Sequence, residues 1–259
     1  MTTGGSPDDA AWPESRRRRI KLALFRGARV IVLPLLRLLL GMRIEGLENV
    51  PPRGGALVVA NHLHNSDPIL LIAAFPRPVF FMAKSDVWRV PVARWFAELS
   101  GAFPVERGRP DRKALRHAEQ ELARGWLVGV FPEGGRSTTG ALKSPYPGVA
   151  LIAARSRVPI IPTAIWGTEV LPFNGKKGRR KGKGWPKVRV RMGKPFYLPE
   201  GTGDGSRPDL ATLTDLMMIE VAKLLPPEYR GIYADRVAEA AAEPHPSPTP
   251  LPTAGEERR

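Results

Sequence analysis

A histidine and an aspartate five residues apart are the side chains in this sequence best suited to chemistry. His62 follows the short apolar run 57–60, which is rich in β-branched residues and is expected to be a buried strand. Asp67 precedes Pro68, a pair of residue types that commonly begins a helix. On a continuous helix, residues five apart point about 140° away from each other. The two side chains therefore meet only across a turn between strand and helix.

Held together, an imidazole and a carboxylate can move a proton. A neutral imidazole is the usual general base near neutral pH, and a carboxylate on its far nitrogen fixes the tautomer and stabilises the imidazolium. No nucleophilic Ser or Cys is needed when the hydroxyl of the substrate attacks. Two alternatives stay open: Asp67 only begins a helix, or His62, His64 and Asp67 bind a metal. No metal is expected, because His117 and His245 lie on a charged helical pattern and in a Pro-rich tail.

Two further expected strands end near an arginine. Arg107 closely follows one of them, and Arg136 follows the other after Glu133 and Gly134. Gly134 and Gly135 would allow a ligand to approach the backbone closely. The two guanidinium groups match a phosphate through paired hydrogen bonds, although each alone also fits an ordinary surface ion pair.

Strand-like and helix-like runs alternate along most of the chain. Strands are expected at 57–60, 79–82, 102–105, 126–131, 160–165 and 188–192, with helices at 68–75, 90–99, 110–124, 147–156 and 208–225. This alternation predicts an α/β fold, a single mixed-sheet domain covered by helices, with functional loops beyond the strand ends. The expected parts are a disordered start (1–14), a basic amphipathic segment (15–43), the α/β domain (44–200), C-terminal helices (201–242) and a disordered tail (243–259) whose prolines exclude helix and sheet pairing.

The segment 15–43 is expected to lie in a membrane interface. A spanning helix needs about 20 apolar residues with few charges, whereas this segment is rich in Lys and Arg and contains Pro34. Drawn as a helix, it gathers four arginines within an arc of roughly 80°: Arg19, Arg26, Arg29 and Arg37. That pattern is typical of a helix whose guanidinium groups meet anionic headgroups. Pro34 suggests two short helices at an angle, and packing of the apolar face on the core of the protein is the alternative.

The charge balance indicates an anionic partner. The formal net charge is +15 over 259 residues, which suits nucleic acid, an anionic membrane surface or phosphorylated substrates. A Gly-interleaved basic loop at 174–187 would bind such phosphates or remain solvated. The absence of cysteine excludes disulfides and thiolate chemistry. A non-catalytic basic protein that binds nucleic acid or an anionic membrane is the alternative class, but no recognisable nucleic-acid module is present, so no nucleic-acid partner is expected.

Taken together, three of these stretches resemble a known family. Residues 62–67, 101–107 and 131–137 match, in order and spacing, the first three motif blocks of the 1-acylglycerol-3-phosphate acyltransferase family. Residues 158–162 look like the fourth block. The resemblance covers roughly residues 56 to 162, and the combination is far more specific than any single block.

The resemblance implies a reaction and roles for four residues. His62 would be the base, Asp67 its orienting partner, and Arg107 and Arg136 the ligands of the acceptor phosphate. The reaction would move an acyl group from acyl-CoA or acyl carrier protein, as co-substrate, to the hydroxyl of a lysophospholipid. The implied acceptor is 1-acyl-sn-glycerol 3-phosphate, which would give phosphatidate. Backbone amides near the turn would stabilise the oxyanion, and no further cofactor is implied.

The same resemblance implies further site residues and a location. Glu133 and Gly134 would belong to the acceptor-binding loop, and Lys84 would add affinity for the phosphate. His64 and Gly135 depart from the family pattern, which more often has Ser and Thr there, so the acceptor headgroup stays open. The chain would be a peripheral or monotopic protein on the cytoplasmic face of a membrane, with anionic lipids as its partner.

Overall fold

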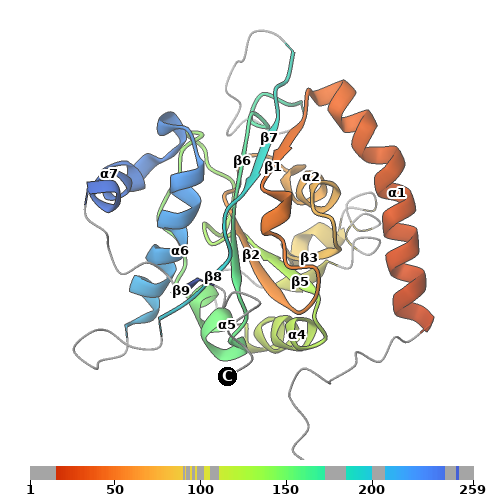
Figure 1. Cartoon of the computed structure of the whole chain (residues 1–259), viewed down its shortest axis with the longest axis horizontal. Helices are drawn as coiled ribbons and strands as arrows, with labels where there is room; N and C mark the ends of the chain where they lie inside the picture. The colour runs from red at the N-terminus through yellow and green to blue at the C-terminus, as the bar shows by residue number, and fades with distance from the viewer. Residues whose placement is uncertain are drawn as a thin grey trace, which may run out of the picture.

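A mixed, mostly parallel β-sheet runs through the centre of the molecule (Figure 1). The computed structural model describes residues 16–89, 91, 94, 97, 102–105, 111–172, 185–199, 208–242 and 249–250. The strands are β1 (Arg43–Glu45), β2 (Ala56–Ala60), β3 (Val79–Lys84), β4 (Phe103–Val105), β5 (Leu127–Val130), β6 (Ile160–Trp166), β7 (Arg189–Met192), β8 (Phe196–Tyr197) and β9 (Thr249–Pro250). Their order is β1-β7-β6-β2-β5-β3-β4, with β8 paired to β6. The expected α/β fold with a mixed sheet is confirmed.

Helices cover both faces of this sheet. The α-helices are α1 (Arg16–Leu40), α2 (Asp67–Ala74), α4 (Arg112–Ala123), α5 (Gly148–Ser156), α6 (Leu210–Leu224) and α7 (Ala234–Ala242). Short 3-10 helices are η2 (Leu47–Asn49), η3 (Ser85–Arg89), η4 (Pro227–Tyr229) and η5 (Gly231–Tyr233). Figure 1 shows α1 and α2 on one side of the sheet and α6 and α7 on the other. Of the helix expected at 90–99, the described residues Pro91, Arg94 and Ala97 are helical.

The alternation of side chains along each strand divides the core into two halves. On β2, Leu57 and Val59 join the cluster formed with α4, α5 and α6. Ala56, Val58 and Ala60 join the cluster formed with α1 and α2. Successive side chains of a strand point to opposite faces, so a continuous apolar run is needed where both faces are covered. This explains why β2 reads as an unbroken apolar run in the sequence.

The order of the strands places two loops side by side at one edge. Strands β6, β2, β5, β3 and β4 are mutually parallel, so their carboxyl ends lie at the same edge. From β2 the chain passes through α2 to β3, whereas from β5 it passes through α5 to β6 on the other side of β2. Neighbouring strands whose connections leave in opposite directions open a crevice beyond their carboxyl ends. The residues that follow β2 and β5 therefore border the expected binding crevice.

Helix α1 differs from the sequence prediction in two respects. It continues through Pro34 as one helix, so the expectation of two helices was wrong. Pro34 removes a hydrogen bond to the carbonyl of Val30, but Val30 is exposed and water can satisfy that group. Arg29 does not face outward with Arg26 and Arg37; its guanidinium turns inward and donates to Ala73 O at 3.2 Å.

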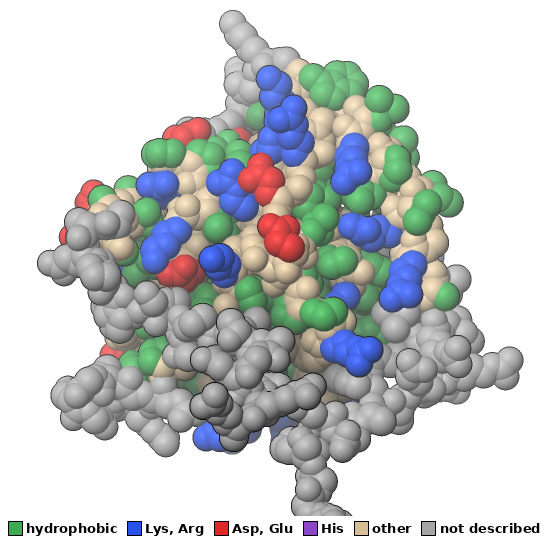
Figure 2. Space-filling model, in the orientation of Figure 1, with side chains coloured by type: hydrophobic (Ala, Val, Ile, Leu, Met, Phe, Trp, Pro, Cys, Tyr) green, Lys and Arg blue, Asp and Glu red, His purple; other side chains and the backbone are tan. Residues whose placement is uncertain are grey.

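The apolar face of α1 is divided between core and surface. Leu33 is buried, and Leu36 and Leu40 pack against the same core cluster. The opposite side exposes six large apolar side chains: Val30, Ile31, Val32, Leu35, Leu38 and Leu39. Figure 2 shows hydrophobic and basic side chains mixed along this helix, at the right of the view. Among the described residues, no helix combines the length and hydrophobicity needed to cross a bilayer.

Several expected segments fall outside the described residues. They include 1–14, most of the basic loop (173–184), 200–207 and most of the tail. Within the tail, Thr249 and Pro250 pair antiparallel with β8, so the expectation that its prolines exclude sheet pairing was wrong at this point. Proline is tolerated on an edge strand because its missing N–H is not needed for the ladder.

Candidate functional site

The structure brings His62 and Asp67 into direct contact. His62 follows the end of β2 and Asp67 is the first residue of α2, so the turn between them reverses the direction of the chain. His62 Nδ1 lies 2.9 Å from Asp67 Oδ2. With Nδ1–H donating to the carboxylate, Nε2 of a neutral His62 keeps its lone pair. The His62 side chain retains 9% exposure, and no hydrogen bond involves its Nε2 among the described residues. This nitrogen is placed to accept a proton.

Asp67 does more than begin a helix. Its Oδ2 also accepts the backbone N–H groups of Leu63 and His64, each at 2.6 Å. The residue at the helix cap is Ser66, and it makes no capping hydrogen bond from its side chain. A carboxylate with no exposed surface requires such donors, because burial of an unpaired charge is costly. The alternative that Asp67 only starts α2 is therefore wrong.

A second carboxylate braces His62 from the neighbouring loop. Glu133 follows β5, and its Oε1 accepts the backbone N–H of His62 at 3.0 Å. Its Oε2 accepts the N–H of Lys143 at 3.3 Å. From the same loop, the N–H of Ser137 donates to the carbonyl of His62 at 2.8 Å. The backbone N–H and the backbone C=O of His62 are thus both held by residues more than seventy positions away in sequence.

These contacts use the backbone N–H groups of the turn as hydrogen-bond donors. The N–H groups of His62, Leu63 and His64 all donate to Glu133 or Asp67. They serve the two carboxylates, so the expectation that the amides near the turn would stabilise an oxyanion was wrong for these three.

Aromatic packing and one glycine shape the loop further. The Phe131 ring stacks on the His62 ring, with centroids 4.2 Å apart and an angle of 18° between the planes. Phe81 stacks in turn on Phe131. Gly134 has φ of +64°, and a Cβ there would lie 2.3 Å from Cε2 of Tyr146. The positive φ favours glycine at 134, and a larger residue there would also require the exposed Tyr146 side chain to move.

His64 links the turn to the segment that follows β6. Its Nδ1 accepts the N–H of Ser66 at 3.0 Å, and its Nε2 lies 3.0 Å from the carbonyl of Pro172. Burial lowers the pKa of His64, against the opposing effect of Asp67, and Arg136 lowers it further. A neutral His64 with its proton on Nε2 satisfies both contacts. Both ring nitrogens are engaged, so His64 does not join His62 and Asp67 as a set of metal ligands, and the described residues hold no such cluster elsewhere.

Two of the three predicted basic residues, Arg136 and Lys84, lie at the same edge of the sheet. Arg136 is half-buried in the loop after β5 and lies near enough to His64 to lower the pKa of that histidine. Lys84 ends β3 and pairs with Asp86. In the register of β3 and β4, Lys84 is opposite Val105, two residues before Arg107. Arg107 itself lies outside the described residues.

Asn61 supports the site but was not predicted from the sequence. Asn61 is buried, and its side-chain amide pairs with the backbone of Ile165 on β6 in both directions, each hydrogen bond being 2.8 Å long. This pair of hydrogen bonds fixes the end of β2 immediately before His62. The only signal in the sequence was a polar residue directly after a buried apolar run, which alone does not distinguish a structural amide from a loop residue.

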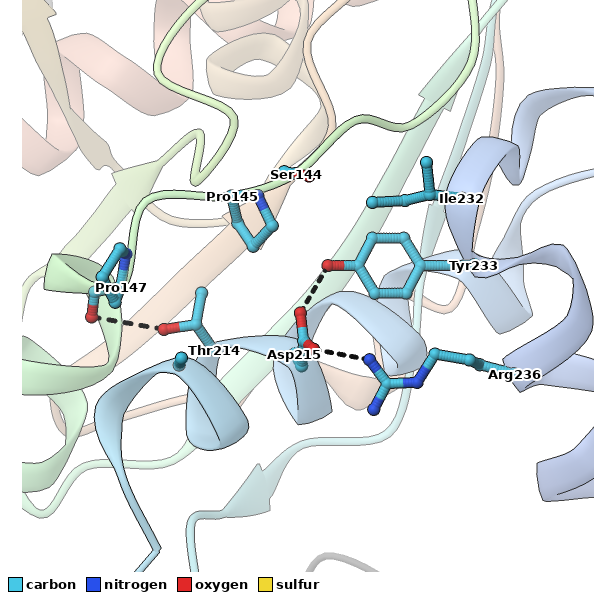
Figure 3. A pocket seen from close by; sticks show the side chains of 9 residues that line it. Ser144, Pro145, Pro147, Thr214, Asp215, Ile232, Tyr233 and Arg236 are labelled. Carbon is cyan, nitrogen blue, oxygen red and sulfur yellow. Dashed lines mark hydrogen bonds and ion pairs between the residues drawn. The ribbon is translucent and has the colours of Figure 1, made fainter.

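A pocket of about 250 Å³ lies elsewhere, between the segment before α5 and the C-terminal helices (Figure 3). Asp215 at its wall accepts hydrogen bonds from Tyr233 and Arg236, and Thr214 donates to Pro147 O. The polar groups of its wall thus largely satisfy one another. None of the predicted site residues lines this pocket.

Glu133 makes the stability of the fold depend on pH. Burial raises the pKa of Glu133 from 4.5 to about 7. The folded chain therefore keeps a proton that the unfolded chain loses, and this stabilisation is complete below pH 4.5 and lost as the pH rises through about 7. The difference corresponds to about 3 kcal/mol. In urea unfolding at pH 5 and pH 8, we expect the fall in unfolding free energy to be smaller for Glu133→Gln than for the unchanged chain. Equal falls would contradict this role of Glu133.

Comparison with known proteins gives relatives named 1-acyl-sn-glycerol-3-phosphate acyltransferase. The chain is 27% identical over 186 residues to the 1-acyl-sn-glycerol-3-phosphate acyltransferase of Bacillus subtilis (strain 168), covering 71% of this chain and 88% of that protein. It is 31% identical over 171 residues to the 1-acyl-sn-glycerol-3-phosphate acyltransferase BAT2, chloroplastic, of Brassica napus, covering 64% of this chain. The match covers 46% of the Brassica protein, so the chain spans about half the length of that relative.

A solved structure agrees with these relatives. The crystal structure of the 1-acyl-sn-glycerophosphate (LPA) acyltransferase, PlsC, from Thermotoga maritima matches with a TM-score of 0.61 and 28% identity, over 82% of this chain and 84% of that one. Residues 41–166 match the acyltransferase family, a range that holds the His62–Asp67 pair and the Glu133 loop. The resemblance of the sequence to the acyltransferase family is thereby confirmed.

Proposed function

We propose that this chain transfers a fatty acyl group from a thioester, acyl-CoA or acyl carrier protein, to the free hydroxyl of a lysophospholipid. The proposed acceptor is 1-acyl-sn-glycerol 3-phosphate, and the product is phosphatidate. The observation that carries the proposal is the His62–Asp67 pair, held where the loops after β2 and β5 meet, with Nε2 of His62 available for a proton. The pair and the family favour catalysis over the alternative of a non-catalytic basic protein that binds nucleic acid.

In the proposed reaction, His62 acts first as base and then as acid. Nε2 takes the proton of the acceptor hydroxyl while the hydroxyl oxygen forms a bond to the thioester carbonyl carbon. The tetrahedral intermediate then breaks its carbon–sulfur bond. The proton passes from the imidazolium to the departing thiolate, which restores neutral His62. Asp67 holds Nδ1–H throughout, so the imidazolium formed in between is stabilised by the adjacent carboxylate.

Removal of the base tests the proposed function. The purified chain is incubated with a labelled acyl thioester and a panel of lysolipids, and ester formation is measured. We expect the highest kcat/KM with lysophosphatidate, and a loss of about 10²-fold or more in kcat for His62→Ala, since general-base catalysis is worth that much. His117→Ala is the matched control, because His117 lies on α4 far along the chain from the turn. Near-normal transfer by His62→Ala would refute the proposal.

Arg136 is proposed to bind the acceptor phosphate, together with Lys84 and Arg107. Arg136→Ala should raise KM for lysophosphatidate about 10- to 100-fold, because a hydrogen bond between charged groups contributes about 1.5–3 kcal/mol. The KM for a monoacylglycerol, which lacks the phosphate, should not change. Arg116→Ala removes an exposed arginine of α4 and serves as the control. An equal effect of Arg136→Ala on both acceptors would exclude the phosphate role.

The outer face of α1 is proposed to rest on an anionic lipid surface at the cytoplasmic face of a membrane. Exposed apolar side chains such as Ile31 and Leu38 would enter the interface, with the exposed Arg26 and Arg37 near headgroups. Burial of one such side chain contributes about 1.5–3 kcal/mol.

Vesicle binding tests this surface. The double variant Ile31→Glu with Leu38→Glu should bind phosphatidylglycerol vesicles at least about 100-fold more weakly in co-sedimentation, because two apolar contacts are lost and two negative charges are added. Ile232→Glu makes one such apolar-to-acidic change at an exposed site on η5 and should bind like the unchanged chain. If both changes weaken binding equally, α1 is not the docking surface.

A further inference from the structure

Arg29 connects the two parts of the chain that the proposed function assigns to lipid and to catalysis. Its Nε donates to Ala73 O at 3.2 Å, and its Nη2 donates to Ala74 O at 3.3 Å. These are carbonyls of the last turn of α2, which have no partner within the helix. One side chain of α1 therefore caps the C-terminal end of α2. The partly buried guanidinium also accounts for a lowered pKa of Arg29.

The other end of α2 holds the catalytic carboxylate. Asp67 begins the helix, and its Oδ2 lies 2.9 Å from His62 Nδ1. Asp67 belongs to α2, whereas His62 extends from β2, so the distance between them depends on how α2 sits on the sheet. Leu70 and Leu71 pack α2 into the core, but apolar packing is less directional than hydrogen bonding. Arg29 adds two directed bonds at the end that faces α1.

Because α2 is a rigid helix, a displacement at its C-terminal end changes the position of Asp67 at its N-terminal end. Asp67 and Ala74 are separated by about 10 Å along the axis at about 1.5 Å per residue, so a tilt of about 6° moves one end by about 1 Å relative to the other. A displacement of about 1 Å in a catalytic arrangement can cost about 10²-fold in rate. Loss of the Arg29 contacts would thus reach the His62–Asp67 pair through a rigid helix.

We propose that Arg29 is a positioning residue that couples the seating of α1 on a lipid surface to the His62–Asp67 geometry through α2. The inference rests on the proposed function. It separates Arg29 from two other arginines of α1: Arg26 and Arg37 are exposed, whereas Arg29 is turned towards α2. Arg29 acts on the chemical step and not on attraction to headgroups.

The test compares Arg29→Gln with Arg26→Gln, which removes the same charge from the same helix without touching α2. Both are assayed on the same phosphatidylglycerol vesicles, with kcat and KM for lysophosphatidate measured separately. We expect kcat of Arg29→Gln to be about 10-fold below that of Arg26→Gln, with similar KM values, because geometry at the base changes while acceptor binding does not. Arg29→Lys should recover part of kcat, since an ammonium can reach one of the two carbonyls. Equal kcat for the two Gln variants would overturn the proposal.

Two further measurements keep the outcome decisive. If Arg29→Gln does not fold, as judged by its melting curve, Arg29→Lys and Arg26→Lys are compared in the same way with charge preserved. Amide hydrogen exchange in the α2 peptide is measured without substrate, and faster exchange is expected for Arg29→Gln than for Arg26→Gln. Indistinguishable exchange rates would overturn the α2 link. If the unchanged chain acylates no lysolipid, the proposed function fails, and the exchange comparison still decides whether Arg29 fixes α2.

Discussion

The carboxylate of Asp67 is the contact on which the site depends. One oxygen accepts three N–H groups, from the imidazole of His62 and from the amides of Leu63 and His64. Hydrogen bonds to a charged group contribute about 1.5–3 kcal/mol each, and without them a fully buried carboxylate would be strongly unfavourable. The same oxygen thus stabilises the turn and orients the imidazole of His62. The shape of the backbone and the tautomer of His62 have a single common cause.

The sheet places this turn against a second one. Because β2 and β5 are adjacent and parallel, the loop after β5 lies beside the loop after β2. Glu133 and Ser137 use that proximity to hold the N–H and the C=O of His62. Phe131 adds its ring to the face of the imidazole. An imidazole held at its backbone, ring face and Nδ1 has little freedom left except at Nε2, which is the atom that the proposed reaction needs.

Helix α1 adds a third layer outside this arrangement. Its inner side contributes Leu33 to the core and Arg29 to the end of α2, while its outer side is apolar and exposed. A helix that meets water with such a face is suited to a surface that is itself partly apolar. Its contact with α2 means that the part of the chain proposed to meet lipid is also in contact with the part that carries Asp67. The proposed lipid-facing helix α1 and the helix that carries Asp67 are therefore in direct contact.

The sequence by itself determined the alternation of strands and helices, the turn between β2 and α2, and the residues that meet in it. Those features depend on local periodicity, on Pro68 and on the short spacing from His62 to Asp67, all of which are visible in a few consecutive residues. Only the tertiary structure decided that Glu133 braces His62, that Asn61 pairs with Ile165, and that Arg29 caps α2. These contacts join residues 44 to 104 positions apart, so no local pattern predicts them. The direction of each polar side chain is set by which unsatisfied backbone group the folded chain brings within reach, and that is decided only when the elements pack together.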